Sequence, residues 1–300
     1  MVDRADIVSK SNAGISRRSL LAGLGATAAA TVAAGAAALP RSAVSSWDIT
    51  TDVLIAGSGA AGVSAAIEAR QAGADVLLIE SLARFGGSSA MSGGVVYAGG
   101  GTALQKALKV TDSAEEMYRF ISLAGGKHPS LDKIQLYCEE SAAHFDWLVA
   151  QGVPYSEKLT TAKGLPMGDE SLYFSGTELA WPARDLATPA PRGHVPGVPG
   201  MNGGRRLMQV LLSRAEALGV SLRAGVAAGR LVIESDGRVA GVLVTIDGQR
   251  QAIGVNRGIV LACGGFIHNR QMLQQYAPEL YDCSVPWGNA GDQGDGINMG

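Results

Sequence analysis

The stretch from Thr51 to Glu80 constrains the fold of this chain more than any other part of its sequence. A short apolar run at residues 52–56 is followed at once by GSGAAG at residues 57–62, a helical pattern and a second apolar run that ends in Glu80. This order of strand, glycine turn, helix, strand and terminal acid predicts a dinucleotide-binding βαβ unit. Its three glycines permit a tight turn, close approach of a pyrophosphate and close packing of the helix, and the acid accepts hydrogen bonds from a ribose. The N–H groups at the start of the helix favour phosphate.

A second strip of glycines and serines, SLARFGGSSAMSGG at residues 81–94, follows the acid. Glycines let backbone N–H groups approach a cofactor, and serines add short hydroxyl donors, whereas the alternative is a flexible loop. With this strip the chain resembles the flavoprotein family of fumarate reductase, succinate dehydrogenase and the 3-ketosteroid dehydrogenases. In that family the strip crosses the FAD pyrophosphate and the flavin ring. Members with covalent flavin carry a histidine in it, and this chain has Ala90 and Met91 there. The resemblance therefore implies FAD that is held non-covalently.

The resemblance continues to the end of the chain. RGIVLACGGFIHN at residues 257–269 is similar to the returning strand of the family, and GDQGDGINMG at residues 291–300 is similar to its GDG segment that touches FAD. Cys263 stands where threonine is common, and we interpret it as a small buried residue rather than a redox centre. Because the polypeptide of the family continues beyond this motif, the resemblance implies that a C-terminal part is missing.

The expected FAD contacts come from the two glycine segments, the acid, a meander strand, the returning strand and the GDG segment. They are Gly57, Gly59, Ala60, Ala61, Gly62, Glu80, Ser81, Gly86, Gly87, Ser88, Ser89, Ser92, Gly93, Gly94, Ala227, Ala262, Gly264, Gly265, Asp292, Asp295 and Gly296.

Composition excludes several classes of protein. A chain of 300 residues that is 47% hydrophobic and 17% charged can bury a large core or two domains. A net charge of −2 without a basic cluster argues against nucleic acid as a partner. Cys138, Cys263 and Cys283 have neither metal-ligand spacing nor an even count, so we expect three reduced thiols and no metal site.

The pattern along the chain predicts an α/β fold with an insertion. Residues 50–101 and 201–300 are expected to form a Rossmann-like FAD-binding domain with an antiparallel β-meander. Residues 102–200 are expected to form an inserted, mainly helical cap domain for the substrate, incomplete in this chain. The prolines between residues 155 and 200 predict loops without regular elements. The meander and the strand after it are predicted from short patterns at residues 220–224, 230–234, 239–246, 251–255 and 258–262.

Three residues are candidates for catalysis. Hydride transfer at carbon needs fixed donors and an acid or base. Fumarate-reductase-like members carry Arg-x-His where the chain re-enters the first domain, and there the histidine binds a substrate carboxylate. Arg192 and His194 match this pattern, although the residues after them differ, and Tyr97 follows the flavin strip. The alternative is an ordered loop with satisfied side chains, in which Tyr97 simply packs. His128, His144 and His268 are expected on the surface or in loops.

The resemblance implies an FAD-dependent oxidoreductase acting on CH–CH groups. It would transfer hydride between flavin N5 and a carbon–carbon bond next to a carbonyl. Residues 97–107 and the APRGH segment are similar to the 3-oxosteroid dehydrogenases, which need an apolar cleft with few donors. A fumarate reductase-like dicarboxylate or enoate reductase is the first alternative. It stays possible because a dicarboxylate site needs converging cations, which Arg184, Arg192, Arg205 and Arg206 could supply. A flavin-binding protein without catalysis is the second. The expected partners are a small-molecule substrate, steroid or enoate, and an electron acceptor or donor.

The first 45 residues are predicted to be a signal and linker. SRRSLL at residues 16–21 is a twin-arginine pattern, and an alanine-rich stretch follows at residues 20–39, with small-residue cleavage candidates at residues 36–43. Gly23, Gly25 and Gly35 make this stretch a poor membrane anchor, so no stable membrane span is expected. We expect export to the periplasm or cell envelope, and a cytoplasmic protein if these residues are not a signal.

Replacing Arg17 and Arg18 together by lysine is expected to block export. The substitution keeps the charge but removes the arginine pair on which the route depends. The precursor should then accumulate in the cytoplasm with its cofactor bound, which cell fractionation measures. Arg4→Lys, outside the pattern, is the control. Unchanged fractionation of the double variant would show that residues 16–21 are not an export signal.

Overall fold

The computed structural model describes residues 37–126, 128–162 and 164–300. The predicted signal and most of the alanine-rich stretch lie outside these residues. Within the described residues, none of the helices is both long and apolar enough to cross a membrane.

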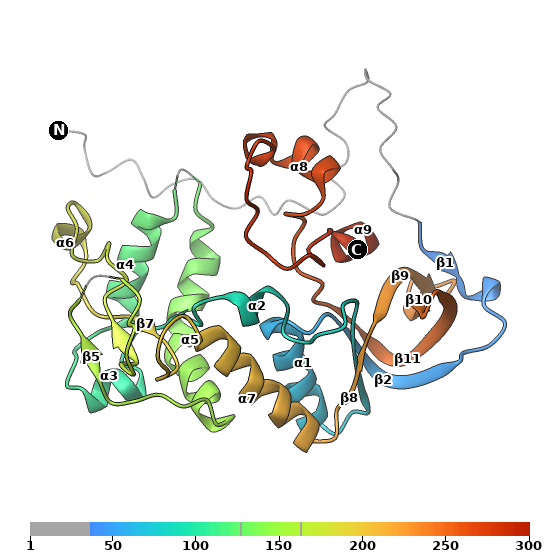
Figure 1. The fold of residues 1–300 in the computed structure, drawn as a ribbon, viewed down its shortest axis with the longest axis horizontal. Coiled ribbons are helices and arrows are strands. Elements are labelled where there is room, and N and C mark those ends of the chain that lie inside the picture. The colour runs from blue at the N-terminus through green and yellow to red at the C-terminus, as the bar shows by residue number, and fades with distance from the viewer. Residues whose placement is uncertain (1–36, 127, 163) are drawn as a thin grey trace. The chain divides into compact units, whose positions relative to one another are not determined.

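A seven-stranded sheet forms the centre of the part that is predicted to bind FAD, with the strand order β1-β9-β10-β11-β2-β3-β8 (Figure 1). Strands β11, β2, β3 and β8 run parallel, and β9, β10 and β11 form an antiparallel meander. The bounds are β1 Leu39–Pro40, β2 Ile49–Ala56, β3 Val76–Glu80, β8 Ser221–Ala224, β9 Val226–Ile233, β10 Val239–Ile246 and β11 Gln249–Leu261. The predicted α/β fold with a meander is confirmed.

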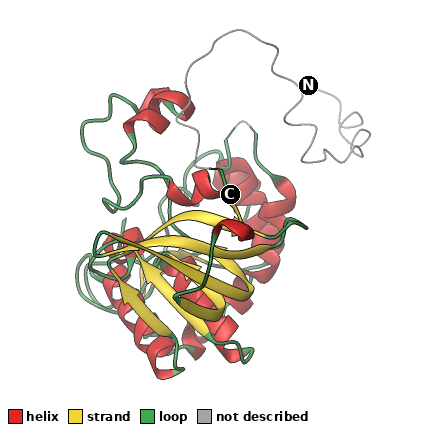
Figure 2. Ribbon diagram, turned by 90° about the vertical axis from the view of Figure 1, so that its right-hand side faces the viewer, coloured by secondary structure: helices red, strands yellow, loops and turns green. Residues whose placement is uncertain are grey.

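The parallel strands are covered on both faces. Ile55 of β2 packs with Val63 and Leu211, which belong to helices α1 (Ala60–Gln71) and α7 (Gly203–Ala217). Its neighbour Leu54 points to the other face and packs with Val242 of the meander. Successive side chains of a strand point to opposite faces, so strands buried on both sides become continuous apolar runs. Figure 2 shows the strands with helices packed against them.

Two predictions about the strands were wrong. Strand β8 does not join the meander but pairs in parallel with β3 at the other edge of the sheet. It follows helix α7, and a strand that returns after a crossover helix lies parallel to its neighbours. The patterns at residues 251–255 and 258–262 form one strand, β11, whose first half pairs with β10 and whose later part pairs with β2.

The predicted linker takes part in the fold from Ala37 onward. Strand β1 pairs in parallel with β9, and the short helix η2 (Arg41–Ala43) follows. Trp47 lies against β10 and β11, where a Cβ atom on Gly241 or Gly254 would come within 2.6 or 2.7 Å of its indole ring. This docking was not predicted because a two-residue strand leaves no periodic pattern.

The insertion contains helices and a small sheet. Its helices are α3 (Ala103–Ala107), α4 (Ala114–Ala124), α5 (Leu131–Ala150) and α6 (Ala183–Leu186). The sheet has the order β4-β7-β6-β5 and is built from two-residue strands: β4 Val96–Tyr97, β5 Leu159–Thr160, β6 Leu172–Tyr173 and β7 Gly193–His194. The prediction that residues 155–200 hold no regular element was therefore wrong. The prolines flank these short strands without interrupting them.

Three further short helices lie near the carboxyl ends of the parallel strands. Helix α2 (Gly87–Met91) belongs to the glycine-serine strip, and α9 (Asp295–Met299) belongs to the GDG segment. Helix α8 (Arg270–Tyr276) and the turn η3 (Pro278–Leu280) connect the returning strand to that segment. The motifs singled out in the sequence thus meet at one end of the sheet (Figure 1).

Candidate functional site

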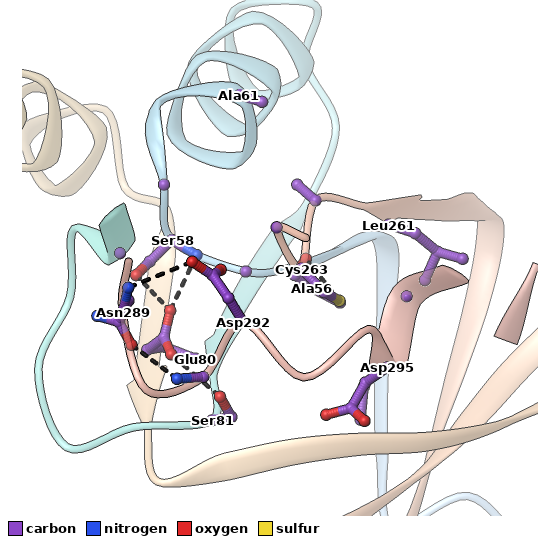
Figure 3. Close-up of a pocket in the computed structure, with 18 of the residues that line it drawn as sticks. Ala56, Ser58, Ala61, Glu80, Ser81, Leu261, Cys263, Asn289, Asp292 and Asp295 are labelled. Carbon is purple, nitrogen blue, oxygen red and sulfur yellow. Dashed lines mark hydrogen bonds between the residues drawn. The ribbon is translucent and has the colours of Figure 1, made fainter. Parts of the chain in front are cut away.

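A cavity of about 450 Å³ opens where β2 and β3 end. Its walls come from the glycine turn, the acid, the glycine-serine strip, the returning strand and the last glycine segment (Figure 3). The predicted residues that line it are Gly57, Gly59, Ala60, Ala61, Glu80, Ser81, Gly87, Ser88, Ser89, Ala262, Gly264, Asp292, Asp295 and Gly296. Together with Val226 and Ala228 of β9, segments spread over residues 56–297 thus form one site.

Several predicted contacts lie elsewhere. Val226 and Ala228 line the cavity, whereas Ala227 between them points to the other side of β9, and its contact with FAD stays a prediction. Gly62, Gly86, Ser92, Gly93, Gly94 and Gly265 also lie outside the cavity lining. Of these, Gly62 packs against the glycine turn, and Gly94 lies against the start of α7.

The three glycines of the turn have different surroundings. A Cβ atom on Gly57 would lie 2.2 Å from the Ala262 carbonyl oxygen, and one on Gly62 would lie 1.9 Å from that of Gly57. A Cβ on Gly59 would have only the Ser89 hydroxyl near it, at 3.5 Å. Gly57 and Gly62 are therefore required by packing within the protein. Gly59 leaves space in the cavity itself, which fits the close approach of a pyrophosphate.

Glu80 is held at the floor of the cavity by four donors. Its Oε2 accepts hydrogen bonds from the backbone N–H of Ser58 at 3.1 Å and from the Ser58 hydroxyl at 2.6 Å. Its Oε1 accepts from the N–H of Leu82 at 2.9 Å and from the Ser81 hydroxyl at 3.2 Å. A carboxylate that is already held in this way fits a ribose, whose hydroxyls donate to it.

A loop from the far end of the sequence completes the wall. The Ser88 hydroxyl donates to Oδ2 of Asp292 at 2.6 Å and accepts from the N–H of Asn289 at 2.8 Å. Asn289 was not predicted, because it lies between the two motifs that the sequence singled out. The other lining residues that were missed are Ala56, Ser58, Ile79, Val226, Ala228, Leu261, Cys263, Gly291 and Ile297. Most flank predicted positions.

Cys263 lines the cavity without the features of a redox centre. Its thiol donates to the carbonyl oxygen of Ala56 at 3.4 Å. Burial raises the pKa of this thiol, so it stays protonated at neutral pH. Cys263 therefore behaves as a small, partly buried side chain, as interpreted from the sequence.

The three catalytic candidates lie together in the cap. Tyr97 of β4 is the register partner of Gly193 in β7, between Arg192 and His194. In the described part of the chain all three lie outside the lining of the cofactor cavity. Arg192 is fully buried, and its Nη2 and Nε donate to Asp112 at 2.7 and 3.0 Å. Burial acts to raise the pKa of Asp112, but the bonds and charge of Arg192 outweigh it and hold that pKa below its usual value.

His194 has a partner on each ring nitrogen. Its Nδ1 donates to the backbone carbonyl of Arg192 at 2.9 Å, and its Nε2 accepts from the Thr102 hydroxyl at 2.9 Å. The ring lies 4.4 Å from that of Phe145, centre to centre. Burial lowers the pKa of His194 to about 4, so the ring is neutral at pH 7. These bonds give Arg192 and His194 a structural role in the cap, whereas within the described residues the buried Tyr97 hydroxyl and Arg192 Nη1 have no hydrogen-bond partner. The catalytic role of all three stays a prediction.

Comparison with known proteins identifies the family. The family model described as FAD binding domain matches residues 52–300. The chain belongs to this family. Its members include 3-ketosteroid dehydrogenases and fumarate reductase flavoproteins. The family indicates FAD as the cofactor, and the donors and the free space of the cavity fit that group.

Three relatives illustrate the similarity. The chain is 34% identical over 206 residues to the 3-oxo-5-alpha-steroid 4-dehydrogenase of Comamonas testosteroni, covering 67% of this chain and 38% of that protein. It is 30% identical over 261 residues to a fumarate reductase (cytochrome) of Shewanella frigidimarina, covering 83% and 39%. A crystal structure of a 3-ketosteroid-Δ4-(5α)-dehydrogenase from Rhodococcus jostii RHA1, in complex with 4-androstene-3,17-dione, is similar with a TM-score of 0.84 and 40% identity, covering 88% and 56%. The chain thus spans about 40–55% of the length of these relatives.

Gly59→Val is expected to abolish FAD binding while the fold is kept. The added side chain would enter the cavity where the pyrophosphate approaches, and its Cβ would have only ordinary contacts with the protein. Flavin absorbance per protein measures binding, and circular dichroism measures the fold. Gly258→Val is the matched control, because nothing lies within 4 Å of a Cβ there. Normal flavin content in Gly59→Val would contradict the assignment of this turn.

The cap is expected to lose stability as the pH falls from about 6.5 to 4. In this window the unfolded chain protonates His194, and the folded protein, in which burial lowers the pKa to about 4, does not. The difference of about 2.5 pH units corresponds to about 3 kcal/mol in the free energy of unfolding. His194→Gln cannot titrate, so the stability difference between it and the unchanged protein should shrink with falling pH. Urea unfolding at several pH values measures this, and a constant difference would refute it.

Proposed function

We propose that this protein is an FAD-dependent oxidoreductase that acts on the CH–CH group next to a ketone, with a 3-oxosteroid as its substrate. The similarity to the steroid-bound dehydrogenase, at 40% identity over 88% of the chain, carries this proposal. When bound, FAD supplies the hydride acceptor or donor. The residues of this chain bind the cofactor, orient it and exclude water.

FAD is held without a covalent bond. The strip at residues 86–94 has no histidine, and the Cys263 thiol stays protonated and bonded to a backbone carbonyl. Glu80 would bind the ribose side, and the start of α1 with Ser88 and Ser89 would meet the pyrophosphate. Acid precipitation should release all flavin to the supernatant. Flavin that stays with the precipitate would refute non-covalent binding.

The surroundings of the glycine-serine strip favour an apolar substrate. Met91, Val95 and Met201 are exposed large apolar side chains, with 63%, 41% and 58% of their surface accessible. A Cβ atom on Gly93 would lie 2.8 Å from the side chain of Leu165. Several apolar side chains therefore lie beside the strip that is expected to cross the flavin, as a steroid requires.

The arginines give less support to a dicarboxylate. Arg192 is already paired with Asp112 in the cap interior, and Arg184 contacts Asp185 on an exposed helix. A dicarboxylate site needs several cations that converge on two charges. The fumarate reductase relatives keep a dicarboxylate or enoate reductase as the second candidate.

Anaerobic flavin spectra distinguish the two candidates. A 3-oxosteroid with a saturated A ring should bleach the oxidised flavin, because the ketone acidifies the carbon beside it, which would lose a proton to a base, while the next carbon would give a hydride to the flavin. The same steroid without the 3-oxo group is the matched control and should have no effect. Fumarate should leave dithionite-reduced flavin unoxidised. Rapid oxidation by fumarate, with no response to the steroid, would reject the steroid and favour the second candidate. A protein that responds to neither would be a flavin-binding protein without this catalysis.

A further inference from the structure

Ser58, between the first two glycines of the turn, is fully buried and yet lines the cofactor cavity. The glycine pattern places no demand on this position, and the sequence analysis gave it no role. A buried hydroxyl is stable only when its hydrogen-bonding capacity is used. Its partners therefore show what Ser58 does.

The Ser58 hydroxyl connects three separate segments. It accepts a hydrogen bond from the N–H of Gly86 at 2.9 Å and donates its one proton to Oε2 of Glu80 at 2.6 Å. The result is a series of two hydrogen bonds that runs from the Gly86 N–H through the Ser58 hydroxyl to the Glu80 carboxylate. It joins the glycine turn, the acid at the end of β3 and the start of the glycine-serine strip. Figure 3 shows Ser58 and Glu80 side by side.

Both residues that Ser58 connects, Glu80 and Gly86, have a function in the cavity. Glu80 is 8% exposed, and its Oε1 is held by Leu82 and Ser81. Its Oε2 accepts from the backbone N–H of Ser58 at 3.1 Å and from the Ser58 hydroxyl at 2.6 Å, so the hydroxyl makes the shorter bond to this oxygen. Gly86 has φ +111° and precedes helix α2, which carries Ser88 and Ser89 into the cavity. A short bond to a charged acceptor is among the stronger hydrogen bonds in proteins.

We propose that Ser58 is a positioning residue for the cofactor, which holds the Glu80 carboxylate in the orientation that accepts the ribose hydroxyls. The inference rests on the FAD-binding part of the proposed function and is independent of the substrate. A purely structural serine would stabilise the fold without changing how the ribose is recognised. That difference can be measured.

The test compares FAD, ADP and 2′-deoxy-ADP as ligands of the flavin-free protein. Loss of the 2′-hydroxyl removes a donor to Glu80, so the unchanged protein should bind ADP more tightly than its deoxy analogue. Ser58→Ala should weaken FAD about tenfold or more and reduce the preference for ADP. Ser64→Ala on helix α1, outside the cavity lining, is the matched control and should bind all three ligands normally.

A double-mutant cycle with Glu80→Gln tests whether Ser58 acts through the acid. If it does, the double variant should bind FAD little more weakly than Glu80→Gln alone. Ser58→Cys, which keeps the shape but is a weak donor, should give an intermediate loss and serves if the alanine variant does not fold.

Two results would overturn the proposal. Unchanged FAD affinity in Ser58→Ala and Ser58→Cys would show that the bond has no role in binding. A second result would show a structural role only: Ser58→Ala binds FAD more weakly but keeps the full preference for ADP over 2′-deoxy-ADP, and its loss of affinity adds to that of Glu80→Gln in the double variant. An unchanged protein that binds no FAD would instead refute the cofactor assignment, before any variant is compared.

Discussion

The close contact between the glycine turn, helix α1 and the returning strand is the constraint on which the rest of the FAD-binding part depends. Gly57 and Gly62 allow the backbone of the turn to lie against both the helix and Ala262. A larger side chain at either position would force these elements apart, because its Cβ atom would collide with backbone atoms that cannot rotate away. The carboxyl ends of β2 and β11 are thereby brought to the start of α1. The cavity forms at this junction, where helix N–H groups and strand ends face the same space.

The cap depends on a second, polar constraint. The chain leaves the FAD-binding part through β4 and returns through β7, and these two strands pair with each other. Beside them, the buried Arg192–Asp112 pair is completed by Gln105, which donates to the same carboxylate and to the carbonyl of Pro191. Removal of one partner from such a pair leaves a buried charge and costs about 3–5 kcal/mol. The two connections between the FAD-binding part and the cap are therefore held together by contacts between residues about 80 to 100 positions apart in the sequence.

The local parts of this structure were predictable from the sequence and the distant ones were not. The βαβ unit around residues 57–62 and the acid Glu80 follow from one contiguous pattern, and most of the cavity lining follows from three such patterns. The role of Arg192 could not be predicted, because its partner Asp112 lies far away in the sequence and in no recognisable motif. The side of β9 on which Ala227 lies could not be predicted either, because alternation along β9 depends on its pairing register, which a short pattern leaves open.

The docked segment before β2 has a consequence for how the protein behaves with copies of itself. Strand β9 would be the bare edge of the large sheet without β1, and unpaired edges are templates for strand addition by another chain. Leu39 and Pro40 cover part of this edge, and the proline has no N–H to offer a further strand. Leu39 and Pro40 lie within the range of predicted cleavage sites, so they protect the folded protein from edge-to-edge aggregation only where cleavage leaves them in place.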